Sequence, residues 1–583
     1  MKKNLYKHTR RNFLKTITLS IPALSSLTFF PFLSSGENYK KESAKISSRN
    51  QSNKNTGTLQ FDLVVYGATS AGVMAAYTAR MYGLSVLLVE PGRHLGGLTS
   101  GGLGRTDTGD HLNAITGLSR EFYLRVGQYY GMNQEAWTFE PHVAEQVFKR
   151  YVDEANLEVM FSRRVKYAEV INGSIKSVIL EYAAKGIENN LKVAANYFID
   201  ATYEGDLMAR AGVSYTIGRE GNSVYNETYN GVVPSKRLGS YGNTQRKREW
   251  PNVDPYIKPG KPDSGLLPEI NGIGHAQPGT GDKKVQAYCY RMCLTQDKNN
   301  QMPITEPEGY DPSRYELLIR LMKVEPWDSL QHGFNIATMP NGKTDWNNDG
   351  VVGFSTDYIG KNYNFPEADY NEREKIWNEH KKYQQGLIYF IAHDERIPSD
   401  TRKAMQSWGY CRDEFLDTDG WPHALYIRES RRMVSDFVMT EHQCVGNKPV
   451  RDGIAMGAYA LDSHNCQRVV VDGHVENEGN FFVGGFDPYP ISYQSIVPKK
   501  DEIDNLWVPV CLSASHVAFG SIRMEPVYMG LGHATGVAAM FAAEKRKKVQ
   551  QVNVGNIQKE LRQNPLPNRK IPSKYQKILP YQG

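Results

Sequence analysis

The sequence predicts an α/β fold in which a parallel sheet with its covering helices is interrupted by a long α+β insertion. A strand, a glycine-containing turn, a helix and a second strand follow one another within residues 61–90. A further strand with an acidic turn comes at 196–206, and a helix of small residues comes only at 527–540. The intervening residues have a different pattern, so we expect one domain to be split by another.

The length and composition agree with a protein of several segments. The chain has 583 residues, which is too long for one small hydrophobic core. Its residues are 40% hydrophobic and 23% charged, and this composition excludes a fibrous or disordered protein. We expect a leader at 1–33, a linker at 34–60, the first part of the α/β domain at 61–214, the inserted domain at 215–480, the second part of the α/β domain at 481–550 and a C-terminal tail at 551–583.

The basic excess belongs to the N-terminal segment. The whole chain has a formal charge of +6, but residues 1–60 hold eleven Lys or Arg and two Glu, which leaves −3 for the rest. No nucleic-acid partner is therefore expected.

The leader indicates export. Arg10-Arg11 is followed by Phe-Leu-Lys and by a mostly apolar run at 17–33 that contains two prolines. This order is typical of a signal peptide rather than a spanning helix, and the arginine pair resembles the twin-arginine signal. We expect a periplasmic or otherwise exported protein with no membrane anchor after signal removal. The alternative is a chance Arg-Arg before a short anchor.

The first strand–helix–strand unit has the features of a dinucleotide-binding site. The turn begins at Gly67 and ends at Gly72, and the second strand ends in Glu90. Gly67 permits a tight turn, Gly72 lets the helix lie close to the strand, and Glu90 can accept hydrogen bonds from a ribose. Thr69 replaces the middle glycine of the usual fingerprint, which weakens the motif taken alone.

A second glycine-rich stretch favours FAD over NAD. Residues 91–104 follow Glu90 directly and contain Gly96 and Gly97. Nicotinamide enzymes have no need of such a loop, whereas in FAD enzymes of the glutathione-reductase-like kind it passes along the pyrophosphate towards the isoalloxazine. The sequence therefore predicts a Rossmann-type FAD-binding domain of that kind, interrupted by an α+β substrate domain.

Two later segments fit the same fold. Residues 196–206 end in an acid-and-glycine turn that closes with Asp206. Arg523 precedes the small-residue helix that contains Gly532. The N-terminus of this helix could favour negative charge on a reduced flavin. The alternative is a tightly packed buried helix.

At these residues the chain resembles the FAD-dependent oxidoreductase family of exported bacterial proteins, described as xanthan lyase-like and distantly heterodisulfide-reductase-subunit-A-like. The matching stretches are 67–72, 94–104, 200–206, 288–295, 425–433, 459–464, 491–499 and 513–536. The resemblance implies FAD contacts at Gly67, Gly72, Glu90, Gly96, Gly97, Asp206 and Gly532, with Arg523 beside the flavin helix and Val165 presenting its backbone to adenine. A likeness to heterodisulfide reductase would suggest cysteine ligands for iron–sulfur clusters. The six cysteines of this chain form no Cys-x2-Cys run, so no cluster is expected.

Arginines and histidines are the candidate catalytic residues. Residues 426–432 include Arg428 and Arg431, which could clamp a carboxylate, hold a polyol or stabilise a reduced flavin. The alternative is an internal Arg–Glu network. His516 and His464 are the candidate bases for taking a substrate proton, and either could instead be structural.

Two weaker patterns remain as alternatives. His94 lies where some flavoproteins bind the flavin covalently. Residues 345–350 copy the first half of a calcium loop, but Thr356 stands where the bidentate Glu belongs, so a solvated turn is expected and no metal ligands are assigned.

The expected function is FAD-dependent hydride transfer from a small polar substrate, a carbohydrate or polyol, to flavin. Oxygen, a quinone or a small redox protein would accept the electrons. One alternative is a carbohydrate-binding or lyase-type exported protein in which FAD is structural or absent. Another is an NAD-linked dehydrogenase, which residues 94–104 disfavour.

Overall fold

A βαβ unit opens the main sheet, as the sequence predicts. Strand β1 (Leu59–Tyr66) leads into helix α2 (Ser70–Met81) and strand β2 (Val86–Glu90). β1 pairs in parallel with β2 on one side and with β6 (Leu191–Asp200) on the other. Because the carboxyl ends of parallel strands meet at one edge, the residues that follow Tyr66, Val89 and Ile199 converge there.

A computed structural model describes residues 57–108, 111–184, 186–187, 189–233, 251–348 and 353–566. The described residues form one compact unit, which begins at Gly57. The predicted leader, most of the linker and the last residues of the tail lie outside the described residues. No helix in the described ranges is both long and apolar enough to cross a membrane.

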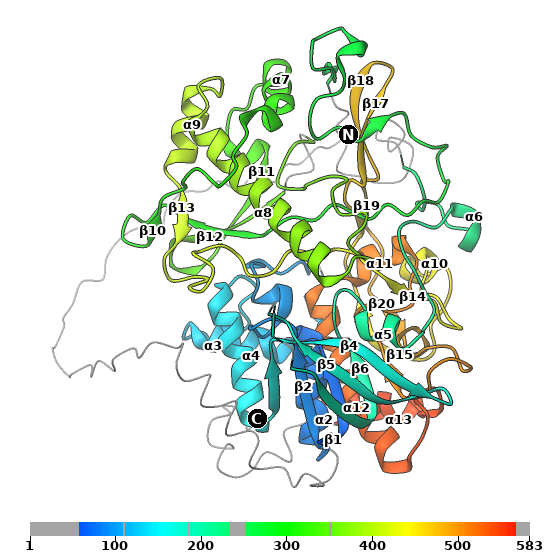
Figure 1. Cartoon of the computed structure of the whole chain (residues 1–583). Helices are drawn as coiled ribbons and strands as arrows, with labels where there is room; N and C mark the ends of the chain where they lie inside the picture. The colour runs from blue at the N-terminus through cyan, green and yellow to red at the C-terminus, as the bar shows by residue number, and fades with distance from the viewer. Residues whose placement is uncertain are drawn as a thin grey trace, which may run out of the picture. The chain divides into compact units, whose positions relative to one another are not determined.

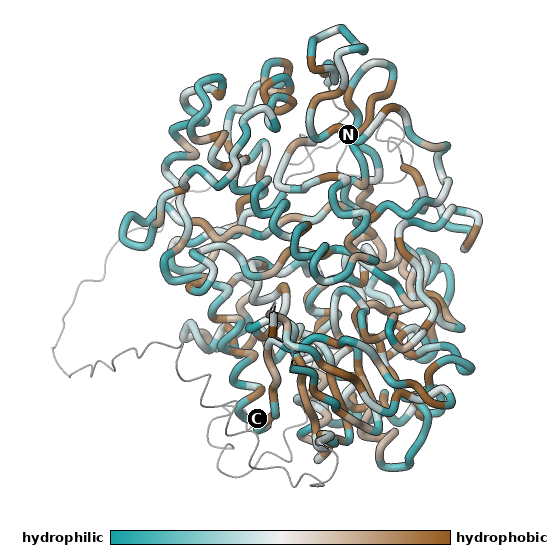
Figure 2. The backbone as a smooth tube through the Cα atoms, in the orientation of Figure 1, coloured by the Kyte–Doolittle hydropathy of each residue, from teal (hydrophilic) through white to brown (hydrophobic). Residues whose placement is uncertain are grey.

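The main sheet has seven strands in the order β3-β2-β1-β6-β5-β4, with β21 beside the second half of β6. Its remaining strands are β3 (Glu158–Phe161), β4 (Arg163–Ile171), β5 (Ser174–Tyr182) and β21 (Leu506–Trp507). β3 pairs in parallel with β2, and β21 pairs in parallel with β6. β4, β5 and β6 form an antiparallel meander. The parallel centre is apolar on both faces, which Figure 2 shows as brown segments along β1 and β2.

Helix α12 packs directly on α2, although about 450 residues separate them in the chain (Figure 1). The helices of this layer are α3 (Gly117–Tyr129), α4 (Pro141–Ala155), α11 (His516–Ile522), α12 (Glu525–Lys545) and α13 (Val554–Gln563), with the short α5 (Asp206–Arg210) after β6. A Cβ on Gly532 of α12 would lie 2.2 Å from the Ala71 carbonyl oxygen, and one on Gly536 would lie 2.7 Å from that of Ala75. The small residues of α12 therefore allow the two helix backbones to touch.

The middle of the chain forms a second, antiparallel sheet in the order β10-β13-β9-β12-β11. Its strands are β9 (Met292–Thr295), β10 (Gln301–Met302), β11 (Phe334–Thr338), β12 (Lys343–Asn348) and β13 (Gly409–Cys411). Helices α7 (Glu316–Val324), α8 (Tyr370–His393) and α9 (Ser399–Gln406) lie in the same part of the molecule, drawn in green to yellow in Figure 1.

Short elements connect these two parts. They are β7 (Tyr215–Thr216), α6 (Asn222–Tyr225), β8 (Gly272–Ile273), β14 (Arg432–Met433), α10 (Glu441–Cys444), β15 (Gly453–Gly457), β16 (Leu461–Ser463), β17 (Gln467–Val471), β18 (His474–Glu478), β19 (Phe481–Val483) and β20 (Tyr489–Ser492). In the described residues 226–233 and 251–285, regular structure is limited to β8 and a 3-10 turn at Pro262–Ser264.

Two expectations need correction. The calcium-like segment is not a solvated turn: Asp345 lies in β12, is fully buried and forms an ion pair with Arg291. The segment after 551 is not only a tail, since α13 packs on α12 and buries Ile557 completely. In both cases pairing with a distant segment decides the structure, which a local sequence pattern does not report.

Candidate functional site

Thr69 caps α2, whose first turn is buried beside the glycine-rich loop. Its Oγ1 accepts a hydrogen bond from the amide of Gly72 at 3.2 Å and donates one to the carbonyl of Ala201 at 2.7 Å. These two bonds hold the Thr69 hydroxyl against the protein backbone. Thr69 therefore serves as an N-cap, which answers the objection that its side chain would hinder a phosphate at this helix N-terminus.

Glycines make the turn and the following loop possible. A Cβ on Gly72 would lie 1.8 Å from the Gly67 carbonyl oxygen, and Gly67 has φ +97°. Gly96 and Gly97 have φ +98° and +56°, and Gly96 forms a bridge with Thr69. The two glycine loops thus lie against each other at the start of α2, which is where a dinucleotide pyrophosphate would bind.

Carboxylates gather at the carboxyl edge of the main sheet. Glu90 accepts hydrogen bonds from the amides of Ala68 at 2.7 Å and Gly92 at 2.6 Å. Burial raises the pKa of Glu90 to about 7, and it raises the pKa of Glu204, which neighbours Glu90, to about 7 as well. Oxygen acceptors at the end of β2 suit the hydroxyls of a ribose.

Two arginines from the inserted region neutralise this edge. Arg373 of α8 forms a bidentate pair with Asp206 at 2.7 and 3.0 Å, and Arg431 contacts the same carboxylate at 2.8 Å. Burial alone would raise the pKa of Asp206. The attraction of Arg373 is the largest opposing effect, and with the neighbouring arginines it lowers the pKa of Asp206 to about 2. Arg431 therefore lies with the cofactor half of the molecule, and its predicted catalytic role stays a prediction.

The Asp206–Arg373 pair predicts a defined acid sensitivity. Because the pKa of Asp206 is lower in the folded protein than its ordinary 3.8, its contribution to stability is complete above about pH 4 and is lost as pH falls towards about 2. Arg373→Gln should cost ~3 kcal/mol and move acid unfolding to higher pH. Lys375→Gln, an exposed change on the same helix, is the control. Equal acid midpoints by tryptophan fluorescence would contradict this assignment.

Val165 presents its backbone near the sheet edge, but both of its backbone groups have partners. Its amide donates to the Tyr66 hydroxyl at 3.3 Å, and its carbonyl accepts from the Tyr370 hydroxyl at 2.9 Å. The predicted adenine contact stays a prediction, and it would have to share or replace these bonds.

A buried carboxylate joins the start of α12 to the start of α2. Glu525 accepts hydrogen bonds from Ser70 at 2.6 Å, Thr99 at 2.6 Å and Tyr203 at 2.8 Å. Burial raises its pKa, and the three hydroxyls oppose that change. This connection fixes the N-terminus of α12 beside the glycine-rich loop, where the sequence predicts the flavin's pyrimidine end.

A second charged cluster lies between the glycine-rich loop, β9 and the start of α12. Arg291 is paired with Asp345, Arg428 with Asp357 and Arg523 with Asp462, at 2.5, 2.9 and 3.0 Å. His464 contacts Asp357 through Nδ1 at 2.8 Å. The rings and guanidinium groups come together at Tyr426, which lies 5.6 Å from Arg291 and 5.1 Å from Arg428, measured from each guanidinium carbon to the ring centre.

Asp107 is the accessible acid of this cluster, which we call the Asp107 cluster. It is half-buried and lines a cavity beside Met524. Burial raises the pKa of Asp107, Arg291 and Arg523 lower it, and Asp462 and Asp345 raise it. Sequence reasoning missed this residue, although its place three residues after the loop that ends at Gly104 was a usable signal.

The comparisons assign the family. A family model described as FAD dependent oxidoreductase matches residues 62–561, which is most of the chain. The chain belongs to this FAD dependent oxidoreductase family. No curated protein matches. FAD is its cofactor, and the α/β fold with a parallel sheet is confirmed.

Solved structures similar to this FAD dependent oxidoreductase are remote. THI4 of Thermovibrio ammonificans is 17% identical, with a TM-score of 0.23 over 32% of this chain and 74% of its own. The myxobacterial chondrochloren halogenase CndH, described as FAD-dependent, is 15% identical, with a TM-score of 0.23 over 28% and 41%. The L-amino acid deaminase from Proteus vulgaris is 16% identical, with a TM-score of 0.22 over 27% and 52%.

The histidines of this FAD dependent oxidoreductase have mostly structural partners. His516 is fully buried, with Nδ1 2.8 Å from Glu429 and Nε2 3.2 Å from Ser463. His464 belongs to the Asp107 cluster through its contacts with Asp357 and Asp462. A catalytic role for either stays a prediction.

His94 is poorly placed for a covalent flavin bond. Its Nδ1 lies 3.1 Å from Glu145 and its Nε2 lies 3.1 Å from Asp417, while its ring stacks on His423 at 3.7 Å. Both nitrogens are therefore already hydrogen-bonded to carboxylates, which favours non-covalent FAD.

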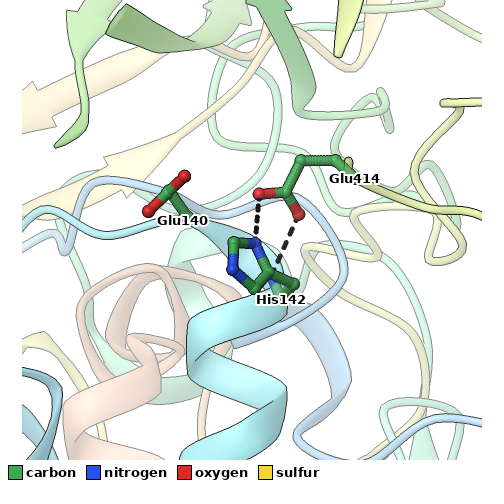
Figure 3. A group of neighbouring side chains, drawn as sticks. All are labelled: Glu140, His142 and Glu414. Atoms are coloured by element: carbon green, nitrogen blue, oxygen red, sulfur yellow. Dashed lines mark hydrogen bonds and ion pairs between the residues drawn. The ribbon is translucent and has the colours of Figure 1, made fainter. Parts of the chain in front are cut away.

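One group of side chains has the composition of a metal site. Glu140, His142 and Glu414 lie together, with Glu414 turned towards His142 (Figure 3). However, the ammonium of Lys343 lies 2.7 Å from both glutamates and 2.8 Å from Asp413. A buried cation of the protein already balances these acids, so the arrangement needs no metal ion.

The residues described at the first site fit FAD. A capped helix N-terminus after β1, two glycine loops in contact and an acid at the end of β2 are the features that a dinucleotide requires. Gly67, Gly72, Glu90, Gly96 and Gly97 lie together around this turn, and their contacts with FAD stay a prediction. Gly532 instead packs on α2, so any contact with the cofactor is through its backbone.

Proposed function

We propose that this FAD-dependent oxidoreductase removes hydride from a small polar substrate at the Asp107 cluster. The observation that carries the proposal is the position of Asp107, an accessible carboxylate flanked by Arg291 and Arg523 and adjoining the start of α12. An oxidation of an alcohol or amine needs a base beside the site of hydride loss. Asp107 supplies one, whereas His516 has no free ring nitrogen.

FAD, when bound, supplies the hydride acceptor. Asp107 takes the proton from the substrate hydroxyl or amine. Arg291 and Arg523 orient the oxygen atoms of the substrate by charged hydrogen bonds. Desolvation raises the pKa of Tyr426 to about 12, so its hydroxyl stays protonated and donates a hydrogen bond. Polar groups of both signs suit a carbohydrate or polyol, which we propose as the substrate class.

Substrate reduction of the bound flavin tests this proposal. The holoenzyme is mixed anaerobically with sugars, polyols, amines and hydroxy acids, and loss of flavin absorbance is followed. Bleaching by members of the first two classes supports a carbohydrate or polyol. Bleaching only by amines or acids overturns the substrate class, and no bleaching by any class overturns the proposed reaction.

We further propose that the protein is exported with its cofactor through the twin-arginine route, on the evidence of Arg10 and Arg11. Replacing both by Lys should retain the protein in the cytoplasm with a normal flavin content. Unchanged export of the double variant, measured by cell fractionation, would contradict the assignment.

A further inference from the structure

A cavity of about 240 Å³ leads from the surface to Asp107. It lies between the start of α3, strand β15 and helices α12 and α13. At its outer end Met456 is 37% exposed and Arg562 is exposed. At its inner end it meets Asp107 and Met524 of the site described above. A small molecule could therefore enter here and reach the cluster.

The wall of the cavity is mainly apolar. Ile115, Ile454 and Val527 are buried along it, and Leu561 of α13 closes one side. Such a wall suits the ring of an apolar ligand, whereas the polar substrate proposed above pairs with the charged groups of the Asp107 cluster. The volume is below the ~300–1,000 Å³ of sites for drug-sized ligands, which suits a compound of one or two rings.

One buried polar atom on this wall lacks a hydrogen-bond partner within the described part of the chain. His533 of α12 is 3% exposed and lines the cavity, and its Nε2 has no hydrogen-bond partner among the described residues. Burial lowers the pKa of His533 to about 4, so the ring is neutral at neutral pH. A neutral imidazole can donate one hydrogen bond to an oxygen of a ligand.

We propose that this cavity binds a small quinone, the electron acceptor of the enzyme. A quinone has a flat apolar ring with an oxygen at each of two ends. The apolar wall matches the ring, while Asp107 and His533 offer hydrogen-bonding groups for the oxygens. The inference rests on the proposed function, because Asp107 holds the proton taken from the substrate and returns it here.

The proposed step reduces the quinone by two electrons, and all atoms and electrons are accounted for. The quinone gains two electrons, which come from the substrate by way of the flavoenzyme reaction, and two protons. Its two carbonyl groups become hydroxyls and its ring becomes aromatic, giving the hydroquinone. One hydrogen of the hydroquinone is the one that left the substrate as hydride with the two electrons, and the other is the proton that Asp107 took from the substrate and gives to a quinone oxygen.

Binding of duroquinone to the oxidised holoenzyme tests the proposal without turnover. Its fully methylated ring resists addition of thiols, and calorimetric titration gives the dissociation constant. Gly530 lines the cavity, and a Cβ there would meet only the Ala455 methyl at 3.7 Å, so Gly530→Leu fills the space without a backbone clash. Gly272→Leu, at an open position outside the cavity, is the matched control.

We expect duroquinone to bind the wild type and Gly272→Leu equally, and to bind Gly530→Leu and His533→Leu at least tenfold more weakly. Absence of binding, or equal binding to Gly530→Leu with unchanged flavin content, overturns the proposal. If substrate bleaches the flavin but duroquinone does not bind, the acceptor assignment alone fails. If duroquinone binds as expected and no substrate bleaches the flavin, the proposed function fails and the quinone site stands.

Discussion

Asp107→Asn should slow reduction of the flavin by substrate by ~10²–10⁴-fold, the usual contribution of a positioned base. Asparagine keeps the size of the side chain but cannot take a proton. Arg291 and Arg523 keep their own partners Asp345 and Asp462, so the substitution should change neither the flavin content nor the melting temperature by much. Stopped-flow absorbance under anaerobic conditions measures the reduction rate.

The pH dependence of the rate of flavin reduction is a second, independent test of Asp107 as the base. A base acts only when ionised, so the rate should rise with pH through the pKa of Asp107 and then level off. Because burial raises that pKa, the rise should lie above the ordinary aspartate value of 3.8. Asp107→Asn should lose this limb, and Asp263→Asn, an exposed change elsewhere, should keep it. A full rate with an unchanged pH profile in Asp107→Asn would show that another group is the base.

Gly72→Ala should abolish FAD binding. The added Cβ would lie 1.8 Å from the carbonyl oxygen of Gly67 and 3.0 Å from its carbon, so the turn must open or α2 must move. Either change displaces the helix N-terminus that faces the pyrophosphate. We expect less than a tenth of the wild-type ratio of flavin to protein absorbance, and reduced solubility.

The control for this change is Gly272→Ala, where a Cβ meets no atom within 4 Å. That variant should keep the wild-type flavin content. Full occupancy in Gly72→Ala would mean that the cofactor does not bind at the start of α2, and it would remove the basis for placing FAD at this edge of the sheet.

The cofactor half could be predicted from the sequence because its signals are local. Gly67, Gly72 and Glu90 lie within one βαβ unit, where strand and helix periods fix their relative positions. Thr69 was the one doubtful residue of the motif. Its role as an N-cap depends on the Ala201 carbonyl, which a pairing of distant strands brings to the turn.

The catalytic half could be predicted only in part. Arg428, Arg431 and Arg432 are close in sequence, but the extended chain turns them to different partners: Asp357, Asp206 and Glu220. These pairs form the internal network of arginines and acids that the sequence offers as the alternative, and a clamp on a ligand stays a prediction. Asp107 and the cavity depend on contacts between segments hundreds of residues apart, and no local pattern reports these.

The most direct test of the account is the visible absorbance spectrum of the purified protein before and after acid precipitation. The account predicts a flavin spectrum that moves completely into the supernatant, because His94 has both ring nitrogens engaged by carboxylates. A colourless protein that also fails to take up added FAD would contradict the central claim.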